Sequence, residues 1–377
     1  MSYDRPAAID CPHGEACGAC ALLGVGYKAQ LGRKRRILGA ALARYRALER
    51  AELLPCLESP FVEKYRNRAK MAVGLSKARP PRLGYFRAGT REITDAPDCR
   101  VLIPEILETS RELRGLLART GGVPRELRHV DLRCGSDPGR QHLILVLRTD
   151  KLPPLPIEKI RRACRRVDGI SVNLNPSAGP QVLKGPILPL WGAREVYVKT
   201  ADLSLRVSPG AFFQVNLSLL PEIHRTMAEL LGRGEVLADL YSGVGTHGLA
   251  LRRRFRRVVC IEGARSAVAD TKATIRRHQL TGVEVVAKPV ERALEPLAAA
   301  RADCVVMNPS RAGAKRAVLE ALAASQARKI VYLSCDPATL CRDLDFLVAR
   351  GFRLVSAQPI DMMPQTRQVE AIALLRR

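Results

Sequence analysis

The second half of the chain alternates between short apolar runs and amphipathic segments. Seven runs of four to seven residues are almost continuously apolar, which is typical of strands that are covered on both faces of a sheet. The runs are Glu235–Tyr241, Val258–Ile261, Val283–Ala287, Ala302–Met307, Lys329–Leu333, Arg353–Pro359 and Val369–Leu375. Segments of helical length separate most of them. The pattern therefore predicts an α/β fold with a doubly wound, seven-stranded sheet whose last two strands form a hairpin.

The first half of the chain has a different pattern. Residues 21–50 carry apolar positions at helical spacing with a basic opposite face, and they predict one long helix. Residues 60–205 contain short β-rich runs interrupted by Gly, Pro and Asn, with two helical inserts, and they predict an α+β domain. The change of pattern near residue 207 divides the chain into two predicted domains, residues 1–207 and residues 208–377.

The charge of the chain favours a polyanionic partner. The formal net charge is +25 and the isoelectric point is near 10.2. Between Lys64 and Arg91 there are nine basic residues and no acidic one, and Tyr65, Tyr85 and Phe86 are interleaved with them. Basic side chains bind phosphates, and aromatic rings stack on unpaired bases. We therefore expect the first half of the chain to bind nucleic acid.

Membrane and export signals are missing from the pattern. No run approaches the roughly 18 apolar residues that span a bilayer. The first ten residues lack the apolar stretch of a signal peptide. We expect a soluble, cytoplasmic and monomeric protein with no membrane partner.

Three cysteines near the start, Cys11, Cys17 and Cys20, have the spacing C-x5-C-x2-C. Thiolate ligands select zinc or an iron–sulfur cluster, and both kinds of site need a fourth ligand. His13 would complete a zinc site, whereas Cys99 would complete a four-cysteine cluster.

A glycine-rich turn follows the first strand of the second half. Gly243, Gly245 and Gly248 match G-x-G-x-x-G between a predicted strand and helix, where the backbone can approach a ligand closely. Glu262 ends the next strand and is placed to accept hydrogen bonds from ribose hydroxyls. This arrangement suits NAD and S-adenosylmethionine equally well.

Three later segments separate these possibilities. They are "MNPSRAG" (307–313), "YLSCDPAT" (332–339) and "DMMPQTRQVEAIALL" (361–375). Together with the cysteine triple, the "FFQVN" segment and the glycine loop, they resemble the RNA uracil-C5-methyltransferases, which make 5-methyluridine in 23S ribosomal RNA and in transfer RNA. The resemblance covers nearly the whole chain. Because the chain starts almost at the cysteine triple, it resembles the shorter ribosomal RNA members of that family, which lack an N-terminal OB-like domain.

The resemblance implies a set of site residues and two cofactors. It implies a 4Fe–4S cluster on Cys11, Cys17, Cys20 and Cys99. It implies that S-adenosylmethionine contacts Gln214, Tyr241, Glu262 and Asn308 beside Gly243 and Gly245. It implies that Cys335 is the nucleophile and Glu370 the proton acceptor in the methylation of a uridine of 23S ribosomal RNA.

The chemistry explains why a cysteine and a carboxylate are needed. Carbon 5 of uracil is a poor nucleophile, and a thiolate that adds to carbon 6 turns it into an enolate that can attack a methyl donor. A base must then remove the proton from carbon 5 so that the thiolate can leave.

The chain also departs from the family pattern, and other functions compete. The departures are Ser310, Asp336, Met363 and Gln368. Asp336 is expected to place a negative charge beside Cys335 and to raise the pKa of its thiol. The alternatives are a transfer RNA uracil-C5-methyltransferase, a homologue that binds RNA and S-adenosylmethionine without turnover, an NAD-dependent oxidoreductase supported only by the glycine loop, and a radical S-adenosylmethionine enzyme. The cysteine spacing and Cys99 argue against the last.

Overall fold

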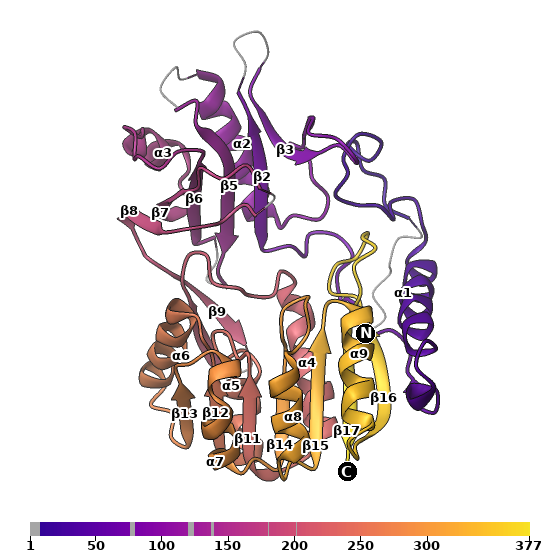
Figure 1. Cartoon of the computed structure of the whole chain (residues 1–377). Coiled ribbons are helices and arrows are strands. Elements are labelled where there is room, and N and C mark those ends of the chain that lie inside the picture. The colour runs from indigo at the N-terminus through magenta and orange to yellow at the C-terminus, as the bar shows by residue number, and fades with distance from the viewer. Residues whose placement is uncertain (1–7, 76–79, 120–123, 137–138, 180, 201) are drawn as a thin grey trace.

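The chain folds around two sheets that lie one above the other (Figure 1). The computed structural model describes residues 8–75, 80–119, 124–136, 139–179, 181–200 and 202–377. The lower sheet comes mainly from the second half of the chain and the upper sheet from the first half.

The lower sheet has eight strands in the order β1-β16-β17-β15-β14-β11-β12-β13. Their bounds are β1 Glu52–Leu53, β11 Gly234–Leu240, β12 Phe255–Ile261, β13 Val283–Val286, β14 Cys304–Met307, β15 Lys329–Ser334, β16 Arg353–Ile360 and β17 Glu370–Arg376. All seven predicted strands are present. Strand β17 runs antiparallel to both neighbours, β15 and β16, which confirms the predicted final hairpin. Strand β1 pairs with β16 and was not predicted, because two residues carry no periodic signal.

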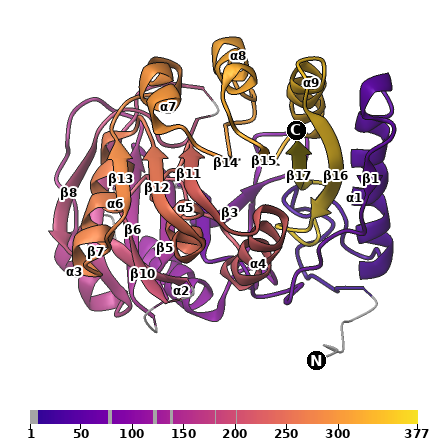
Figure 2. The same ribbon diagram turned by 90° about the horizontal axis from the view of Figure 1, so that it is seen from below.

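Helices cover both faces of the lower sheet, as a doubly wound fold requires (Figure 2). One face carries α4 (Leu220–Leu231), α5 (Gly248–Leu251) and α6 (Arg265–Arg277), and the other carries α7 (Leu294–Ala300), α8 (Arg316–Ala324) and α9 (Pro337–Val348).

Helix α1 (Tyr27–Leu42) lies beside α9 at the edge of this sheet. Its Leu38 and Leu42 belong to the same buried core as α8 and α9. The predicted helix over residues 21–50 was too long. Gly24 takes a left-handed backbone conformation in a turn before α1, and a separate 3-10 turn, Arg46–Leu48, follows it.

The upper sheet has the strand order β4-β3-β2-β5-β6-β7-β8. Its strands are β2 Arg68–Gly74, β3 Arg82–Phe86, β4 Ile93–Asp95, β5 Leu127–Cys134, β6 Gln141–Leu147, β7 Val167–Leu174 and β8 Ile187–Gly192. Only β6 and β7 pair in parallel, and α3 (Ile157–Ala163) joins them. Helices α2 (Pro104–Arg119) and α3 pack their apolar side chains onto this sheet and form its core. The predicted α+β character is therefore present.

A hairpin of β9 (Val196–Thr200) and β10 (Leu203–Val207) follows the upper sheet. It packs against α6, and its buried residues share a core with Val244 and Leu249 of the second half. The domain division near residue 207 stays a prediction. No helix among the described residues has the length and apolar character needed to cross a membrane.

Candidate active site

The predicted site residues gather at one edge of the lower sheet. Tyr241, Glu262, Asn308 and Cys335 each come directly after a strand, namely β11, β12, β14 and β15. These four strands are neighbours and run parallel, so their carboxyl ends share one edge. Glu370 begins the antiparallel β17 and lies at the same edge. The strand order reverses between β14 and β11, and such a switch point is where ligands bind in open α/β sheets.

Cys335 and Glu370 face one another across a strand pair. Ser334 is paired with Ala371, so one step further along the register Cys335 lies opposite Glu370. Directly opposed residues of antiparallel strands have Cα atoms about 5 Å apart. Burial is the main cause that raises the pKa of the Cys335 thiol, and the Glu370 carboxylate raises it further. A hydrogen bond from Arg311 and the charge of its guanidinium oppose this rise.

Burial also raises the pKa of Glu370, to about 7, and Lys34 opposes the rise with its positive charge. A carboxyl group with a pKa near 7 is divided between its two protonation states at neutral pH. It can therefore accept a proton and release it again, which is what a general base must do.

The glycine loop after β11 has the strained geometry that its glycines permit. Gly243 and Gly245 have φ values of 56° and 81°, and a Cβ on Gly245 would lie 2.8 Å from the Leu249 side chain. Glu262 Oε2 accepts a hydrogen bond of 2.9 Å from the Gly243 amide, and Glu262 Oε1 accepts one of 2.7 Å from the Ala264 amide. Glu262 thus ties the loop to the end of β12.

Asp239, on β11, is a site residue that the sequence analysis missed. It is fully buried, and its Oδ2 accepts a hydrogen bond of 2.7 Å from the Gly248 amide, which holds the start of α5. Burial raises its pKa to about 7. The signal in the sequence was an acidic residue inside the otherwise apolar run "VLADL".

Two further residues were predicted to contact S-adenosylmethionine. Gln214 lies in the segment between β10 and α4, and its side chain is buried. The Tyr241 hydroxyl donates a hydrogen bond of 3.2 Å to Glu291 Oε1. Tyr241, Glu291 and Ser310 also line a cavity of about 1000 Å³ between α8 and α9, and neither Cys335 nor Glu370 is among its lining residues.

Asp336 does not act on Cys335 in the way that the sequence analysis expected. Its Oδ1 accepts hydrogen bonds of 3.0 Å from the Ala338 and Thr339 amides and caps the N-terminus of α9. The carboxylate is therefore turned into the helix end, where a negative charge is stabilised. Glu370, rather than Asp336, is the carboxylate that raises the pKa of Cys335.

Another departure from the family pattern, Gln368, also has a defined contact. Its Oε1 accepts a hydrogen bond of 2.8 Å from Arg311 Nη2. Because Arg311 also bonds the Cys335 thiol, Gln368 helps to hold the guanidinium against that thiol.

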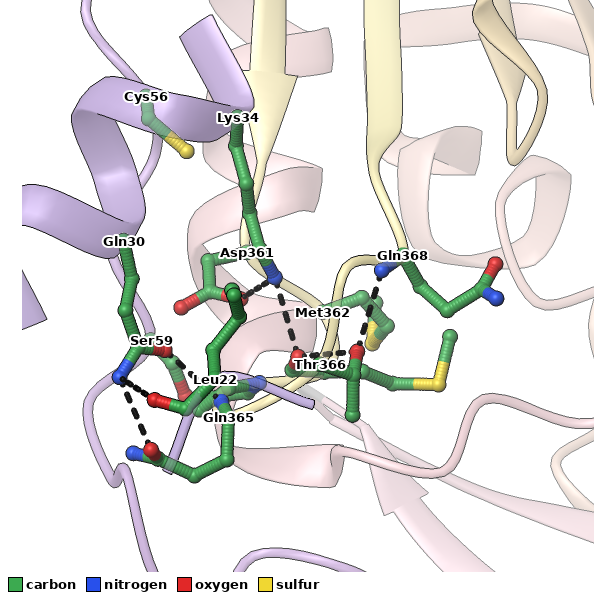
Figure 3. A network of polar contacts seen from close by, with 12 residues as sticks. Leu22, Gln30, Lys34, Cys56, Ser59, Asp361, Met362, Gln365, Thr366 and Gln368 are labelled. Atoms are coloured by element: carbon green, nitrogen blue, oxygen red, sulfur yellow. Dashed lines mark hydrogen bonds and ion pairs between the residues drawn. The ribbon is translucent and has the colours of Figure 1, made fainter. Parts of the chain in front are cut away.

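The segment 361–368 that leads to Glu370 is fixed by residues from the first half of the chain (Figure 3). Lys34 and Asp361 form a fully buried ion pair, and Lys34 Nζ also donates to the Met363 carbonyl at 3.0 Å. Gln30 Nε2 donates to Gln365 Oε1 at 2.9 Å and Gln30 Oε1 accepts from the Gln365 amide at 3.0 Å. The sequence predicts α1 only as a basic helix, because these partners of Lys34 and Gln30 lie more than 300 residues away.

The four N-terminal cysteines share one neighbourhood. The loop from Asp10 to Cys20 packs on the β3–β4 region through the Gly18 amide, which donates to the Phe86 carbonyl at 3.1 Å, and through the Asp98 amide, which donates to His13 Nε2 at 3.3 Å. Burial raises the pKa of the Cys20 thiol, and Cys99, Cys17 and Cys11 raise it further. Among the described residues, no three His, Cys, Asp or Glu side chains are arranged closely enough to form a metal site.

Known proteins are similar to this chain in sequence and in fold. The sequence profile of the tRNA (uracil-5-)-methyltransferase family matches residues 193–377. An uncharacterised RNA methyltransferase of Halalkalibacterium halodurans is 30% identical over 99% of this chain and 84% of its own length. An uncharacterised RNA methyltransferase of Geobacter sulfurreducens is 31% identical over 99% of this chain and 78% of its own length.

One solved structure is similar along nearly the whole chain. It is the tRNA (uracil-54, C5)-methyltransferase of Pyrococcus abyssi in complex with S-adenosyl-L-homocysteine, with a TM-score of 0.76 and 25% identity over 96% of this chain and 86% of that one. The fold, the sequence relatives and the residues at the sheet edge agree. The chain belongs to the RNA uracil-C5-methyltransferase family and is an S-adenosylmethionine-dependent RNA methyltransferase.

Proposed function

We propose that the protein methylates carbon 5 of a specific uridine in 23S ribosomal RNA through a covalent Cys335 adduct. The observation that carries the proposal is the pairing of a thiol and a carboxyl group of raised pKa across the ends of β15 and β17. A thiol nucleophile beside a carboxylate base suits addition to carbon 6 followed by removal of the carbon-5 proton.

Each residue has one task in this reaction. The Cys335 thiolate forms a bond to carbon 6, and the electron pair of the 5,6 double bond moves into an enolate. Carbon 5 then takes the methyl group from S-adenosylmethionine, whose carbon–sulfur bond breaks and leaves S-adenosylhomocysteine. The Glu370 carboxylate removes the carbon-5 proton, the double bond reforms and Cys335 leaves as a thiolate. Arg311 stabilises the thiolate at the beginning and at the end.

The methyl donor is proposed to lie at the switch point between β14 and β11. Gly243 and Gly245 leave its binding edge free of side chains. The family resemblance implies that Glu262 binds the ribose hydroxyls and that Tyr241, Asn308 and Gln214 contact the remaining parts of the donor. The target base must leave its stack to reach Cys335, so the substrate is a loop or a flipped nucleotide.

A 4Fe–4S cluster on Cys11, Cys17, Cys20 and Cys99 is proposed as a structural cofactor. The support is the motif resemblance, the four-thiol donor set and the packing of their loop on the β3–β4 region. In the described structure the thiols are not close enough to form a metal site, so cluster binding would require them to converge. Four thiolates are the usual ligands of such a cluster. These residues would hold it and so order the loop that leads into α1.

Two RNAs are candidate substrates, 23S ribosomal RNA and transfer RNA, and each has its own support. The motif resemblance to the ribosomal RNA enzymes supports 23S ribosomal RNA. The similarity to the Pyrococcus abyssi enzyme, whose substrate is named as a transfer RNA, favours transfer RNA as the second candidate.

Trapping the adduct tests the mechanism. RNA that carries 5-fluorouridine has no carbon-5 proton for Glu370 to remove after methyl transfer, so the covalent complex should persist in denaturing gels. We expect a complex that depends on S-adenosylmethionine and whose cross-linked peptide contains Cys335. Cys341→Ala serves as the matched control, because Cys341 is a buried cysteine of α9 in the core away from the strand ends. A complex that forms equally with Cys335→Ala, or a cross-link to another residue, would overturn the assignment.

A further inference from the structure

A groove of about 490 Å³ lies on the upper sheet, away from the sheet edge that carries Cys335. Pockets of about 300–1,000 Å³ hold small ligands. Strand β2 turns Ala69 and Met71 toward the core with α2, so Lys70 and Ala72 face the opposite side, where the groove is. Its lining residues are Lys70, Ala72, Gly84, Tyr85, Phe86, Arg91, Arg128, His129, Arg148, Ala178, Gly179 and Val182.

The lining of the groove is positively charged. Asp131 lies opposite Lys70 on β5, but its carboxylate is paired with Arg68. Lys70, Arg91, Arg128 and Arg148 line the groove, no carboxylate does, and within the described part of the chain none of these four side chains forms an ion pair. They surround His129, whose pKa is lowered to about 4 by burial and by Arg128, Arg148 and Lys70. Like charges at close range are unfavourable in the free protein, so an anionic ligand would relieve their repulsion.

The groove also offers a flat aromatic surface and an open polar atom. The Phe86 side chain is 42% exposed, and its ring packs edge-to-face on His129 with 6.1 Å between the centroids. His129 Nδ1 is buried and has no hydrogen-bond partner among the described residues. An exposed ring amid cations suits a ligand that has both a π-face and a phosphate, as a nucleotide has.

Contacts of Arg68 connect the groove-bearing face of β2 with the segment that precedes α4. Arg68 lies on the same face of β2 as Lys70, two residues and about 7 Å away. Its guanidinium is held by Asp131 and donates to the Ala211 carbonyl at 3.4 Å. The next residue, Phe212, is 67% exposed and leads to the predicted contact residue Gln214.

We propose that this groove binds an unpaired nucleotide that flanks the target uridine, with its base on Phe86 and its phosphate among Lys70, Arg91 and Arg148. The inference rests on the proposed function for the identity of the ligand. It adds a second recognition site, at which the substrate is held before or while the target base enters the active site. The contact reads an unpaired base through stacking and not through base pairing.

The first test measures the binding of a fluorescein-labelled oligouridylate of about 12 nucleotides by fluorescence anisotropy. Phe86→Ala should weaken binding by about tenfold, as expected for the loss of one stacked base. Arg148→Ala should reduce the slope of log affinity against log salt by about 0.7. Arg256→Ala is the matched control, because Arg256 is 86% exposed at the far end of β12 and should leave both quantities unchanged. Binding of S-adenosylmethionine should be the same in all variants and shows that they are folded.

A base-free polyanion separates stacking from charge. Inorganic polyphosphate should bind Phe86→Ala as well as it binds the unchanged protein, but should bind Arg148→Ala more weakly. In addition, oligouridylate that carries 4-thiouridine should cross-link under ultraviolet light to peptides that contain Phe86 or His129. Equal oligouridylate affinity of Phe86→Ala and Arg256→Ala, or cross-links confined to other peptides, would overturn the proposal. These assays measure binding without methyl transfer. The groove proposal can therefore be wrong while 5-methyluridine is still formed, and it can be right while no 5-methyluridine is formed.

Discussion

Lys34 and Asp361 form an ion pair in which both side chains are fully buried, although 327 residues separate them in the chain. Lys34 belongs to α1, directly after the cysteine loop, and Asp361 begins the segment that leads to Glu370 (Figure 3). Lys34 is also the group that opposes the rise in the pKa of Glu370. The pair therefore connects the N-terminal region to Glu370, the proposed catalytic base, both mechanically and electrostatically.

Lys34→Met should destabilise the protein by about 3–5 kcal/mol, because Asp361 is left charged and buried without a partner. Loss of the positive charge should also raise the pKa of Glu370 further and move the acidic limb of the pH–rate profile to higher pH. Urea denaturation and single-turnover rates between pH 5 and 9 measure the two effects. The double variant Lys34→Met/Asp361→Leu should regain most of the stability but keep the displaced profile. An unchanged profile in both variants would show that Lys34 has only a structural role.

Glu370→Gln should reduce product formation by about 10²- to 10⁴-fold, since the carbon-5 proton has no acceptor. The covalent RNA–protein complex should accumulate on natural RNA, which denaturing gels detect. A variant that makes product at the normal rate would exclude Glu370 as the base.

Glu370→Gln should lower activity but raise the stability of the folded protein above neutral pH. Because the pKa of Glu370 is raised in the folded state, folding becomes less favourable as the pH rises from its unfolded value near 4.5 to about 7. Glu370→Gln removes this penalty, so its melting temperature should exceed that of the unchanged protein by a few degrees at pH 8 and by little at pH 4.5. A lower melting temperature at pH 8 would contradict the raised pKa.

The rate of the unchanged protein should rise with pH toward pH 9. Glu370 must be ionised for proton removal and Cys335 for the earlier addition, and because these are successive steps the slower one sets the rate, so log rate against pH should have a slope near one below pH 7. Above pH 7 Glu370 is ionised, and a slope near one should persist toward pH 9 because the pKa of Cys335 is raised above its ordinary value of 9.0. Single-turnover methylation measures this profile. A rate that is flat from pH 6 to pH 9 would mean that neither group limits the reaction.

Cys99→Ser tests the cluster assignment. Loss of one of four thiolate ligands should lower the iron content of anaerobically purified protein, weaken its visible absorption and lower its melting temperature. Cys164→Ser is the control, because Cys164 is buried in the upper core among apolar side chains. Iron content and stability that are unaffected by Cys99→Ser would remove Cys99 from the ligand set.

The pattern of short apolar runs in the sequence was sufficient to predict the strands β11 to β17 of the lower sheet. Apolar runs covered on both faces are hard to confuse with anything else, and the strands from β11 to β17 lie within three residues of their predicted bounds. The shared edge of Tyr241, Asn308 and Cys335 follows from strand order. Strand β1 and the bonds of Gln30 and Lys34 could not be predicted, because they depend on partners that only the folded chain brings close. The capping role of Asp336 was predictable in principle, since aspartate before proline favours a helix start.

Nucleoside mass spectrometry of 5-methyluridine, measured separately in ribosomal and transfer RNA, shows whether the protein methylates 23S ribosomal RNA. The substrates are RNAs that lack the modification, incubated with anaerobically purified protein and S-adenosylmethionine. We predict new 5-methyluridine in 23S ribosomal RNA that is absent with Cys335→Ala. If 5-methyluridine forms only in transfer RNA, the proposed mechanism stands but the substrate is transfer RNA instead of 23S ribosomal RNA. No 5-methyluridine in either RNA, from protein that still binds S-adenosylmethionine, would contradict the account.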